Sequence, residues 1–327
     1  MQIEPVIPQY FDENALREPA YKLYRIYTPK GRFYYTYDDG DVSLYLGVTT
    51  MLSKLLPTGE GLIKWMCDLG YNESKAYAAM RAAYGTLMHE EIGKFLINKQ
   101  YVLQDIPATV EAYCAKTSYI QYKEEWIDDI TMDMLAFAQF CADYSVIPLA
   151  IEIALAHPDG YSGTVDLICY MTIQEEGYWG ETYKSGERKG EAKLTKRERQ
   201  VLATVDFKSG RKGFHDNYEI QLESYRKLIH ENFPDLFVEK IYNWSPKEWR
   251  TTPSYNLKDQ SNSVDAQKFE MLVELAKIEL LKVPSAYTHA EGTLVLGQEA
   301  GDVFRKEDVI EYIRRYHTER NREEVAL

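Results

Sequence analysis

The chain has 327 residues, of which 45% are hydrophobic and 27% charged, and its formal net charge at pH 7 is −13. This balance is typical of a globular protein with a sizeable core, in one large domain or one domain with an appendage. The acidic charge argues against a protein that coats nucleic acid nonspecifically. No apolar run reaches the roughly 18 residues that a membrane-spanning helix needs. The chain also starts with acids and prolines in place of the basic end and apolar stretch of a signal peptide, so we expect a cytoplasmic protein with no membrane association.

The N-terminal part of the chain is predicted to begin with strands and to continue with helices. Residues 21–50 alternate in strand fashion around the turn sequences TPKG and DDGD, which predicts a three-stranded antiparallel meander. Thr49 and Thr50 are expected to cap a short helix that ends before Pro57. Further helices are predicted over residues 61–69, over 74–98 with Ser74 as the N-cap, and over 106–144 as one or two helices.

Three apolar runs rich in β-branched residues then predict a buried sheet. Residues 146–156, 163–171 and 201–208 are bounded by glycine, proline or aspartate, and we expect them to be neighbouring strands. The polar segment between the last two is expected to form the tip of an extended hairpin. Helices are predicted over residues 216–233, 262–282 and 306–323.

The four cysteines, at positions 67, 114, 141 and 169, are too widely spaced for a CxxC metal site. Their apolar or helical surroundings predict buried free thiols in a reducing compartment. An iron–sulfur cluster needs cysteines at closer spacing, so none is expected.

Two aspartates lie inside predicted apolar strands, Asp166 in TVDLICYM and Asp206 in ATVDFK. Aspartate is depleted from strands, and a buried carboxylate without a partner is costly, so two of them on adjacent strands require a compensating cation. Lys208 follows Asp206 by two residues and leaves the same face of the strand, while Phe207 points the other way. Two interpretations stay open: a structural Asp–Lys pair, or a metal site with a lysine beside it.

His89 lies on a predicted helix in AAYGTLMHEEIGKF, with Gly85 four residues before it and Gly93 four residues after it. The three residues share one helix face. Glycine costs roughly 1 kcal/mol in a helix interior, so close approach of another element or of a ligand would explain the pair. A packed helix crossing with a hydrogen-bonded histidine is the alternative. HEEIG lacks the HExxH spacing of a zinc protease, which excludes that class.

Gln221 and Tyr225 are four residues apart in EIQLESYRKLI and in line with Leu228 and Ile229. They are therefore expected on the inward face of their helix. An inward tyrosine is common, whereas an inward glutamine needs hydrogen-bond partners for its amide. Separately, these residues are weak signals.

Taken in order, the motifs resemble those of the RecB-type branch of the PD-(D/E)XK nuclease superfamily. The resemblance covers residues 45–230, and four motifs in the correct order make it specific. Upstream, GVTTMLSKLLP with Leu62 and Trp65 is similar to the lead-in of the phage-type exonucleases of that branch. The motifs GTxxH, GxxD, DxK and QxxxY correspond here to Gly85–His89, Gly163–Asp166, Asp206–Lys208 and Gln221–Tyr225.

The resemblance implies a metal-dependent deoxyribonuclease. His89, Asp166 and Asp206 would bind Mg²⁺ or Mn²⁺, as one or two ions, with help from the Phe207 carbonyl. Glu152, an acid inside the strand AIEIALA, is expected just outside the ligand set. Lys208 would position or deprotonate the attacking water, and Gln221 and Tyr225 would support the site or the DNA. Thirty-nine residues separate Asp166 from Asp206, a longer interval than is usual for the pattern, which leaves the local path of the DNA open.

The resemblance also implies a fold and partners. The expected fold class is α/β (α+β), a restriction-endonuclease-like core whose central mixed β-sheet is flanked by helices, with an N-terminal β-meander and a helical C-terminal extension. Residues 1–283 would form the nuclease domain and residues 284–327 the extension. The substrate would be linear DNA degraded from its ends, in phage-type recombination or DNA processing, with a single-strand-binding or annealing protein as a further partner. Some processive exonucleases of the superfamily form rings, so a homo-oligomer stays open.

A basic strip interrupts the acidic chain. Residues 184–212 contain ten Lys or Arg and four acids, a charge of +6, which leaves −19 for the rest of the chain. Such a strip suits brief binding of a polyanion, whereas the simpler interpretation is a solvated surface. The candidate DNA-binding residues are Lys189, Lys193, Lys196, Arg197, Arg211 and Lys212.

Three alternative functions fit part of this pattern: a catalytically silent nuclease fold that binds DNA or protein, a metal-dependent hydrolase of another substrate, and an endonuclease with the same active site. The Asp–Asp–Lys–His set argues against the first, because a silent fold needs no buried carboxylates. The basic strip argues against the second. No zinc finger, basic helical arm or helix-turn-helix is recognisable, which favours an exonuclease over a sequence-reading endonuclease.

Overall fold

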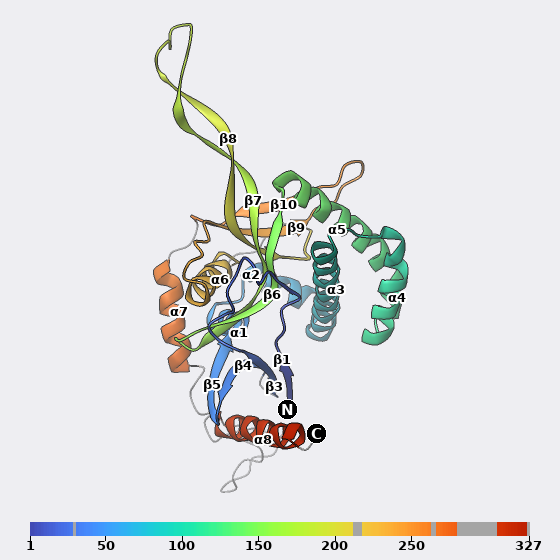
Figure 1. Ribbon diagram of the computed structural model, residues 1–327. Coiled ribbons are helices and arrows are strands. Elements are labelled where there is room, and N and C mark those ends of the chain that lie inside the picture. The colour runs from blue at the N-terminus through green and yellow to red at the C-terminus, as the bar shows by residue number, and fades with distance from the viewer. Residues whose placement is uncertain (29–30, 212–217, 263–265, 280–305, 326–327) are drawn as a thin grey trace.

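The protein has a mixed α/β architecture in which helices flank one large mixed β-sheet (Figure 1). The computed structural model describes residues 1–28, 31–211, 218–262, 266–279 and 306–325. The strands are β1 (Gln2–Pro5), β2 (Tyr10–Phe11), β3 (Tyr24–Thr28), β4 (Gly31–Asp38), β5 (Asp41–Gly47), β6 (Ile147–His157), β7 (Tyr161–Thr182), β8 (Ala192–Phe207), β9 (Lys240–Pro246) and β10 (Tyr255–Asp259). The α-helices are α1 (Val48–Leu55), α2 (Glu60–Leu69), α3 (Tyr71–Asn98), α4 (Ile106–Thr117), α5 (Lys123–Tyr144), α6 (Tyr218–Asn232), α7 (Ala266–Glu279) and α8 (Lys306–Val325), with short 3₁₀ turns at Leu103–Asp105 and Ile120–Tyr122.

Strand β7 is the centre of the sheet, whose main order is β1-β3-β4-β5-β7-β8-β9-β10. Strand β6 pairs with β7 and with β2 beside this path. The pairs β5–β7 and β8–β9 are parallel, and the others are antiparallel. The predicted meander is confirmed as β3–β4–β5, and the three predicted apolar strands are confirmed as the neighbours β6, β7 and β8.

Two hydrophobic clusters fill the two faces of this sheet. One lies under α3, α4 and α5 and contains Trp126, Phe137 and Trp244, and the other lies under α1, α6 and α7. Alternate residues of β8 belong to the first cluster, among them Val205 and Phe207. Because strand side chains alternate between faces, Asp206 points the other way, toward α6. This alternation confirms the expected opposite directions of Asp206 and Phe207.

Strands β7 and β8 continue beyond the sheet as a long two-stranded hairpin (Figure 1). We call residues 172–200 the hairpin arm. Cross-strand pairing along it runs to Tyr178 opposite Leu194 and, after a register shift, to Thr182 opposite Ala192. The Trp179 ring nitrogen donates to the Thr195 carbonyl oxygen (3.1 Å). The predicted extended hairpin is confirmed.

Two predicted helix caps are wrong. Helix α1 begins at Val48 directly after β5, with Gly47 as its N-cap, so Thr49 and Thr50 lie inside the helix. Helix α3 begins at Tyr71, because Gly70 turns the chain with a φ of +95°. Ser74 lies in the first turn of α3, where its hydroxyl donates to the Tyr71 carbonyl oxygen (2.9 Å).

Helix α8 packs against the meander. Val309 and Ile313 join Ile26 and Tyr35 in a small cluster, and His317 Nε2 lies 3.0 Å from the Tyr35 hydroxyl. The predicted helix over 306–323 is confirmed. The predicted helix over 262–282 is α7 where the structure describes it, and the predicted domain boundary near residue 284 lies outside the described residues.

Two smaller features complete the fold. Cys114 and Cys169 are buried and Cys141 is partly buried, but Cys67 is exposed, because none of the residues of α2 is buried. The expectation of four buried thiols is therefore wrong for Cys67. Within the described ranges, no helix is both long and apolar enough to span a membrane.

Candidate metal centre

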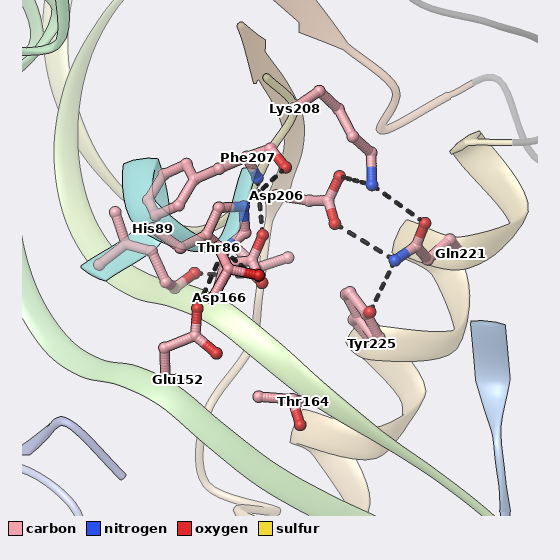
Figure 2. A network of polar contacts seen from close by, with 12 residues as sticks. Thr86, His89, Glu152, Thr164, Asp166, Asp206, Phe207, Lys208, Gln221 and Tyr225 are labelled. Carbon is pink, nitrogen blue, oxygen red and sulfur yellow. Dashed lines mark hydrogen bonds and ion pairs between the residues drawn. The ribbon is translucent and has the colours of Figure 1, made fainter. Parts of the chain in front are cut away.

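A pocket of about 490 Å³ opens where α3 and α6 meet the strands β6, β7 and β8. The GTxxH helix, the two aspartate strands and the QxxxY helix all reach it, although 131 residues of sequence separate His89 from Gln221. Figure 2 shows the resulting network of polar contacts. The predicted site residues that line the pocket are His89, Glu152, Asp166, Asp206, Lys208, Gln221 and Tyr225.

His89, Glu152 and Asp166 form the cluster that could hold a metal ion. One ligand atom from each residue lies within 4.8 Å of the others. His89 Nδ1 is 3.0 Å from Glu152 Oε1 and 3.8 Å from Asp166 Oδ1. On its other side, His89 Nε2 is 3.2 Å from the Phe207 carbonyl oxygen. Both ring nitrogens thus face acceptors, an arrangement that only the doubly protonated imidazolium satisfies completely.

The pKa values of this cluster indicate an excess of negative charge. Burial lowers the pKa of His89, but Asp166 and Glu152 more than offset it and bring the value to about 9. Burial raises the pKa of Asp166, with His89 acting against the rise and Asp206 adding to it. Both shifts follow from buried carboxylates that are short of positive charge. A divalent cation would supply that charge, and its ligands would be two carboxylates and one imidazole.

Glu152 is held in an unusual backbone conformation. Its φ of +55° falls in the left-handed region although it lies inside β6. For a residue other than glycine this costs roughly 1 to 3 kcal/mol and is most common at functional sites. We expected Glu152 just outside the ligand set. In the structure its carboxylate contacts the His89 ring directly.

Asp206 lies beside this cluster and not within it. Its carboxylate is 2% exposed and forms an ion pair with Lys208 (Nζ to Oδ2, 2.6 Å). Asn243 Nδ2 donates to the same oxygen (2.8 Å), and Gln221 Nε2 donates to Oδ1 (3.3 Å). Asp206 and Lys208 lie on the same side of the strand as predicted, and they form the ion pair that was one of the two open interpretations. Asp206 was predicted to be the third ligand beside His89 and Asp166. In the structure the third member of the cluster is Glu152.

Gln221 links Lys208 to Tyr225. Its carbonyl oxygen accepts from Lys208 Nζ (3.2 Å), and its amide nitrogen donates to the Tyr225 hydroxyl (2.7 Å). Gln221 and Tyr225 face inward as predicted, and each is less than a tenth exposed. Burial lowers the pKa of Lys208, but Asp206 and Asp166 outweigh burial and raise it. Lys208 therefore carries a positive charge at neutral pH.

The two glycines on the His89 face are explained by close chain approach. A Cβ atom at Gly85 would lie 3.3 Å from Ser209 Oγ, and one at Gly93 would lie 1.7 Å from Gln9 Oε1. Ser209 directly follows Lys208, and Arg81 of α3 also donates to the Ser209 carbonyl oxygen (3.0 Å). The glycines thus admit other parts of the chain, which was one of the two expected explanations.

Four of the predicted DNA-binding residues lie on the hairpin arm. Lys189, Lys193, Lys196 and Arg197 are exposed, and the Arg197 guanidinium lies over the Trp179 ring, 5.6 Å from its centroid. The arm as a whole has seven Lys or Arg and six Glu, so its net charge is only +1. The positive charge is concentrated on β8 and the turn before it.

Arg211 is occupied elsewhere, and its predicted role in DNA binding needs correction. Its guanidinium forms ion pairs with Asp129 (2.6 Å) and Asp133 (2.7 Å) of α5. Asp133 also accepts from the buried Tyr84 hydroxyl (2.5 Å). Arg211 therefore ties the chain after Lys208 to α5. The last predicted DNA-binding residue, Lys212, lies outside the described residues.

Three residues of the site escaped the sequence analysis. Asn243 is fully buried in β9 and donates to Asp206, and an asparagine inside an apolar strand was a usable signal. Arg25 and Arg32 of the meander also line the pocket, and nothing in their local pattern distinguishes them from solvated strand residues.

A scan of protein-family models finds no match to the chain, and a search of curated proteins finds no similar sequence. The geometry of the pocket is therefore the basis for a functional proposal.

Proposed function

We propose that the protein is a divalent-metal-dependent deoxyribonuclease and that this pocket is its active site. The observation that carries the proposal is the convergence of His89, Glu152 and Asp166 beside a partly buried, charged lysine, Lys208. Buried carboxylates next to a histidine are costly without a cation, and a lysine within the same pocket adds the positive charge that a phosphate substrate needs. The combination fits phosphodiester hydrolysis better than a structural ion pair.

The donor set fits Mg²⁺ or Mn²⁺. Hard oxygen ligands with one imidazole are typical of these ions. When bound, such an ion acidifies water and polarises the phosphoryl oxygen. His89 would then bind in its neutral form and give up one of its two ring protons. The stoichiometry of Mn²⁺ binding in a calorimetric titration distinguishes one bound ion from two.

Lys208 would act as a fixed positive charge. Its raised pKa keeps it protonated, so it is suited to orient the attacking water and to stabilise negative charge that develops on the phosphate. Asp206 and Gln221 hold its ammonium group in place. Asn243 and Tyr225 in turn contact Asp206 and Gln221, so the position of the lysine depends on two further elements, β9 and α6.

The order of elements around the pocket supports the same proposal. Helix α3 comes first in the chain and is followed, after α4 and α5, by three antiparallel strands (β6, β7, β8), a helix (α6) and a strand parallel to β8 (β9). This is the order that we expect for a restriction-endonuclease-like core, and the four motifs fall on it at the positions that the RecB-type resemblance requires. We propose residues 1–283 as the nuclease domain on this basis.

We further propose that DNA ends are the site of attack, in recombination or related DNA processing. The support is the motif resemblance to phage-type exonucleases and a pocket that combines a metal centre with positive side chains. A single-strand-binding or annealing partner and self-association stay predictions of the resemblance.

The proposal is tested by incubating end-labelled linear DNA with the protein and Mg²⁺ or Mn²⁺. We expect release of labelled nucleotides that EDTA abolishes and that Asp166→Asn reduces to background. The matched control is Lys22→Gln, which removes an exposed charge outside the pocket and should leave cleavage unchanged. Cleavage that persists in EDTA or in Asp166→Asn would contradict the assigned site.

A further inference from the structure

The pocket has a second wall that the nuclease motifs do not account for. Arg25 of β3 and Arg32 of β4 line it together with His89, Asp166 and Lys208. Arg25 lies directly across the strand pair from Tyr34, and Arg32 precedes Tyr34 by two residues on the same strand face. Both guanidinium groups lie over the Tyr34 ring, at 5.6 and 5.5 Å from its centroid. The buried tyrosine thus holds two arginines on one side of the pocket.

Neither arginine is neutralised by the protein. Among the residues that the structure describes, no carboxylate lies within ion-pair distance of Arg25 or Arg32. Arg25 donates to the Tyr27 hydroxyl (3.4 Å), and its Nε is buried without a hydrogen-bond partner in the described part of the chain. Both side chains are only partly exposed. A pair of partly buried guanidinium groups in a pocket is a binding site for an anion, and phosphate oxygens match their geometry.

The start of helix α1 adds to the same wall. Gly47, Val48 and Thr49 line the pocket, and this end of the helix has neither a side-chain cap nor an acidic residue in its first turn. The backbone N–H groups of a first helical turn attract anions. Thr49 does not cap the helix, and it lines this wall with a side chain that carries a hydroxyl donor.

The pocket therefore has two chemically different walls. Glu152 and Asp166 with His89 form the cation-binding wall, and Arg25 with Arg32 form the anion-binding wall. The walls are joined by a hydrogen bond between the Tyr34 hydroxyl and Thr164 Oγ1 (2.8 Å), two residues before Asp166. A nucleic acid strand carries a phosphate at every nucleotide, so one phosphate can lie at the metal centre while another lies at the arginines.

We propose that Arg25 and Arg32, with the first turn of α1, bind a phosphate of the substrate strand other than the one that is cut. The inference rests on the proposed nuclease function for the identity of the strand, but the arginine wall itself is a phosphate site whether or not cleavage occurs. The phosphate has two sources: an internal diester of the strand or a terminal monoester at its end.

The test is a binding measurement in EDTA, where metal-dependent cleavage does not take place. A short oligothymidylate labelled at its 3′ end is titrated with protein and followed by fluorescence anisotropy, once with a 5′-phosphate and once with a 5′-hydroxyl. Arg25→Gln and Arg32→Gln should each weaken binding roughly tenfold, which is the loss of one charge-assisted hydrogen-bonded contact. Lys22→Gln, which removes an exposed charge just before β3, should bind like wild type.

The two oligonucleotides identify the source of the phosphate. If the arginine variants lose affinity for both oligonucleotides, the arginines bind an internal diester. If they lose affinity only for the 5′-phosphorylated oligonucleotide, the arginines bind a terminal monoester. Arg32→Lys keeps the charge but not the planar fork, so it should fall between wild type and Arg32→Gln. Thermal melting of each variant establishes that it is folded. Because Arg32 has no described hydrogen bond, its variants should fold even if those of Arg25 do not.

Equal binding by wild type, Arg32→Gln and Lys22→Gln to both oligonucleotides would overturn the phosphate site. The failure of the nuclease proposal looks different. If binding depends on the arginines but no metal-dependent cleavage is seen, the phosphate site stands and the nuclease proposal is rejected. If cleavage depends on the metal but binding does not depend on the arginines, the nuclease proposal stands and the phosphate site is rejected.

Discussion

Gly163 packs against the aromatic ring of Tyr225. A Cβ atom at Gly163 would lie 2.8 Å from Tyr225 Cε1 and 3.2 Å from Leu228 Cδ1. The Tyr225 hydroxyl accepts from Gln221, which in turn contacts Asp206 and Lys208. The glycine of one motif and the tyrosine of another are therefore parts of one packing unit, and the absence of a side chain at 163 sets the position of the lysine.

Gly163→Ala tests this relationship. The added methyl group should push the Tyr225 ring outward, lower the free energy of unfolding by about 1 to 3 kcal/mol and reduce cleavage through the displaced Gln221. Urea unfolding and a DNA cleavage assay measure the two effects. Gly61→Ala is the matched control, because a Cβ atom there meets nothing within 4 Å. If Gly163→Ala and Gly61→Ala change stability and cleavage equally, the contact between Gly163 and Tyr225 does not set the position of the tyrosine.

The roles in the metal centre separate in a titration with Mn²⁺. Glu152→Gln and Asp166→Asn each remove a negative ligand and should weaken Mn²⁺ binding by at least about tenfold, with loss of cleavage. Lys208→Met should also lose cleavage but bind Mn²⁺ as tightly as wild type or more tightly, because it removes a positive charge beside the site. Isothermal titration calorimetry makes the comparison. A lysine variant that loses the metal would show that Lys208 has been assigned the wrong role.

Metal binding should depend on pH through His89. In the metal-free protein its pKa is raised from 6.5 to about 9, so the imidazolium stabilises the fold below about pH 6.5 and this stabilisation is lost as pH rises through about 9. A metal ion requires the neutral ring and competes with the proton. Mn²⁺ affinity should therefore rise with pH below about 9, by at most about tenfold per unit for one proton. The raised pKa of Asp166 acts in the same direction.

Calorimetry in two buffers of different ionisation enthalpy measures this proton release directly. Near neutral pH, wild type should release about one proton from His89 on binding Mn²⁺. His89→Asn should bind weakly and release fewer protons. A Mn²⁺ affinity that is flat with pH would mean that His89 is not a ligand.

The hairpin arm is expected to contribute to DNA binding through four exposed cations. Changing Lys189, Lys193, Lys196 and Arg197 to glutamine should raise the apparent KM for DNA and leave kcat nearly unchanged, because the arm extends away from the rest of the sheet (Figure 1). Each lost phosphate contact should lower the log–log salt slope by about 0.7 to 0.9. KM measured over a range of salt concentrations tests this. An identical slope in the variant would mark the arm as solvated surface, in keeping with its net charge of +1.

The sequence was most informative where a short-range period decides the geometry. Asp206 and Lys208 share a strand face, and Gln221 and Tyr225 share a helix face, so both pairs were placed correctly from spacing alone. The backbone conformation of Glu152 depends on the assembled sheet, and no local pattern encodes it. The polar residue inside an apolar strand at Asn243 was visible in the sequence, but its partner Asp206 on the neighbouring strand was not. Arg211 was misassigned for a related reason. Its charge is visible in the sequence, but its partners Asp129 and Asp133 lie about 80 residues away.

We propose that this pocket hydrolyses DNA with a divalent metal ion and attacks it from the ends. The most direct measurement incubates equal masses of linear and covalently closed circular plasmid with Mg²⁺, using wild type and Asp166→Asn in parallel. We expect wild type to degrade the linear DNA and to spare the circles, and Asp166→Asn to degrade neither. Survival of both DNAs with wild type would contradict the nuclease assignment. Loss of the circles as fast as the linear DNA would contradict attack at ends and make the protein an endonuclease.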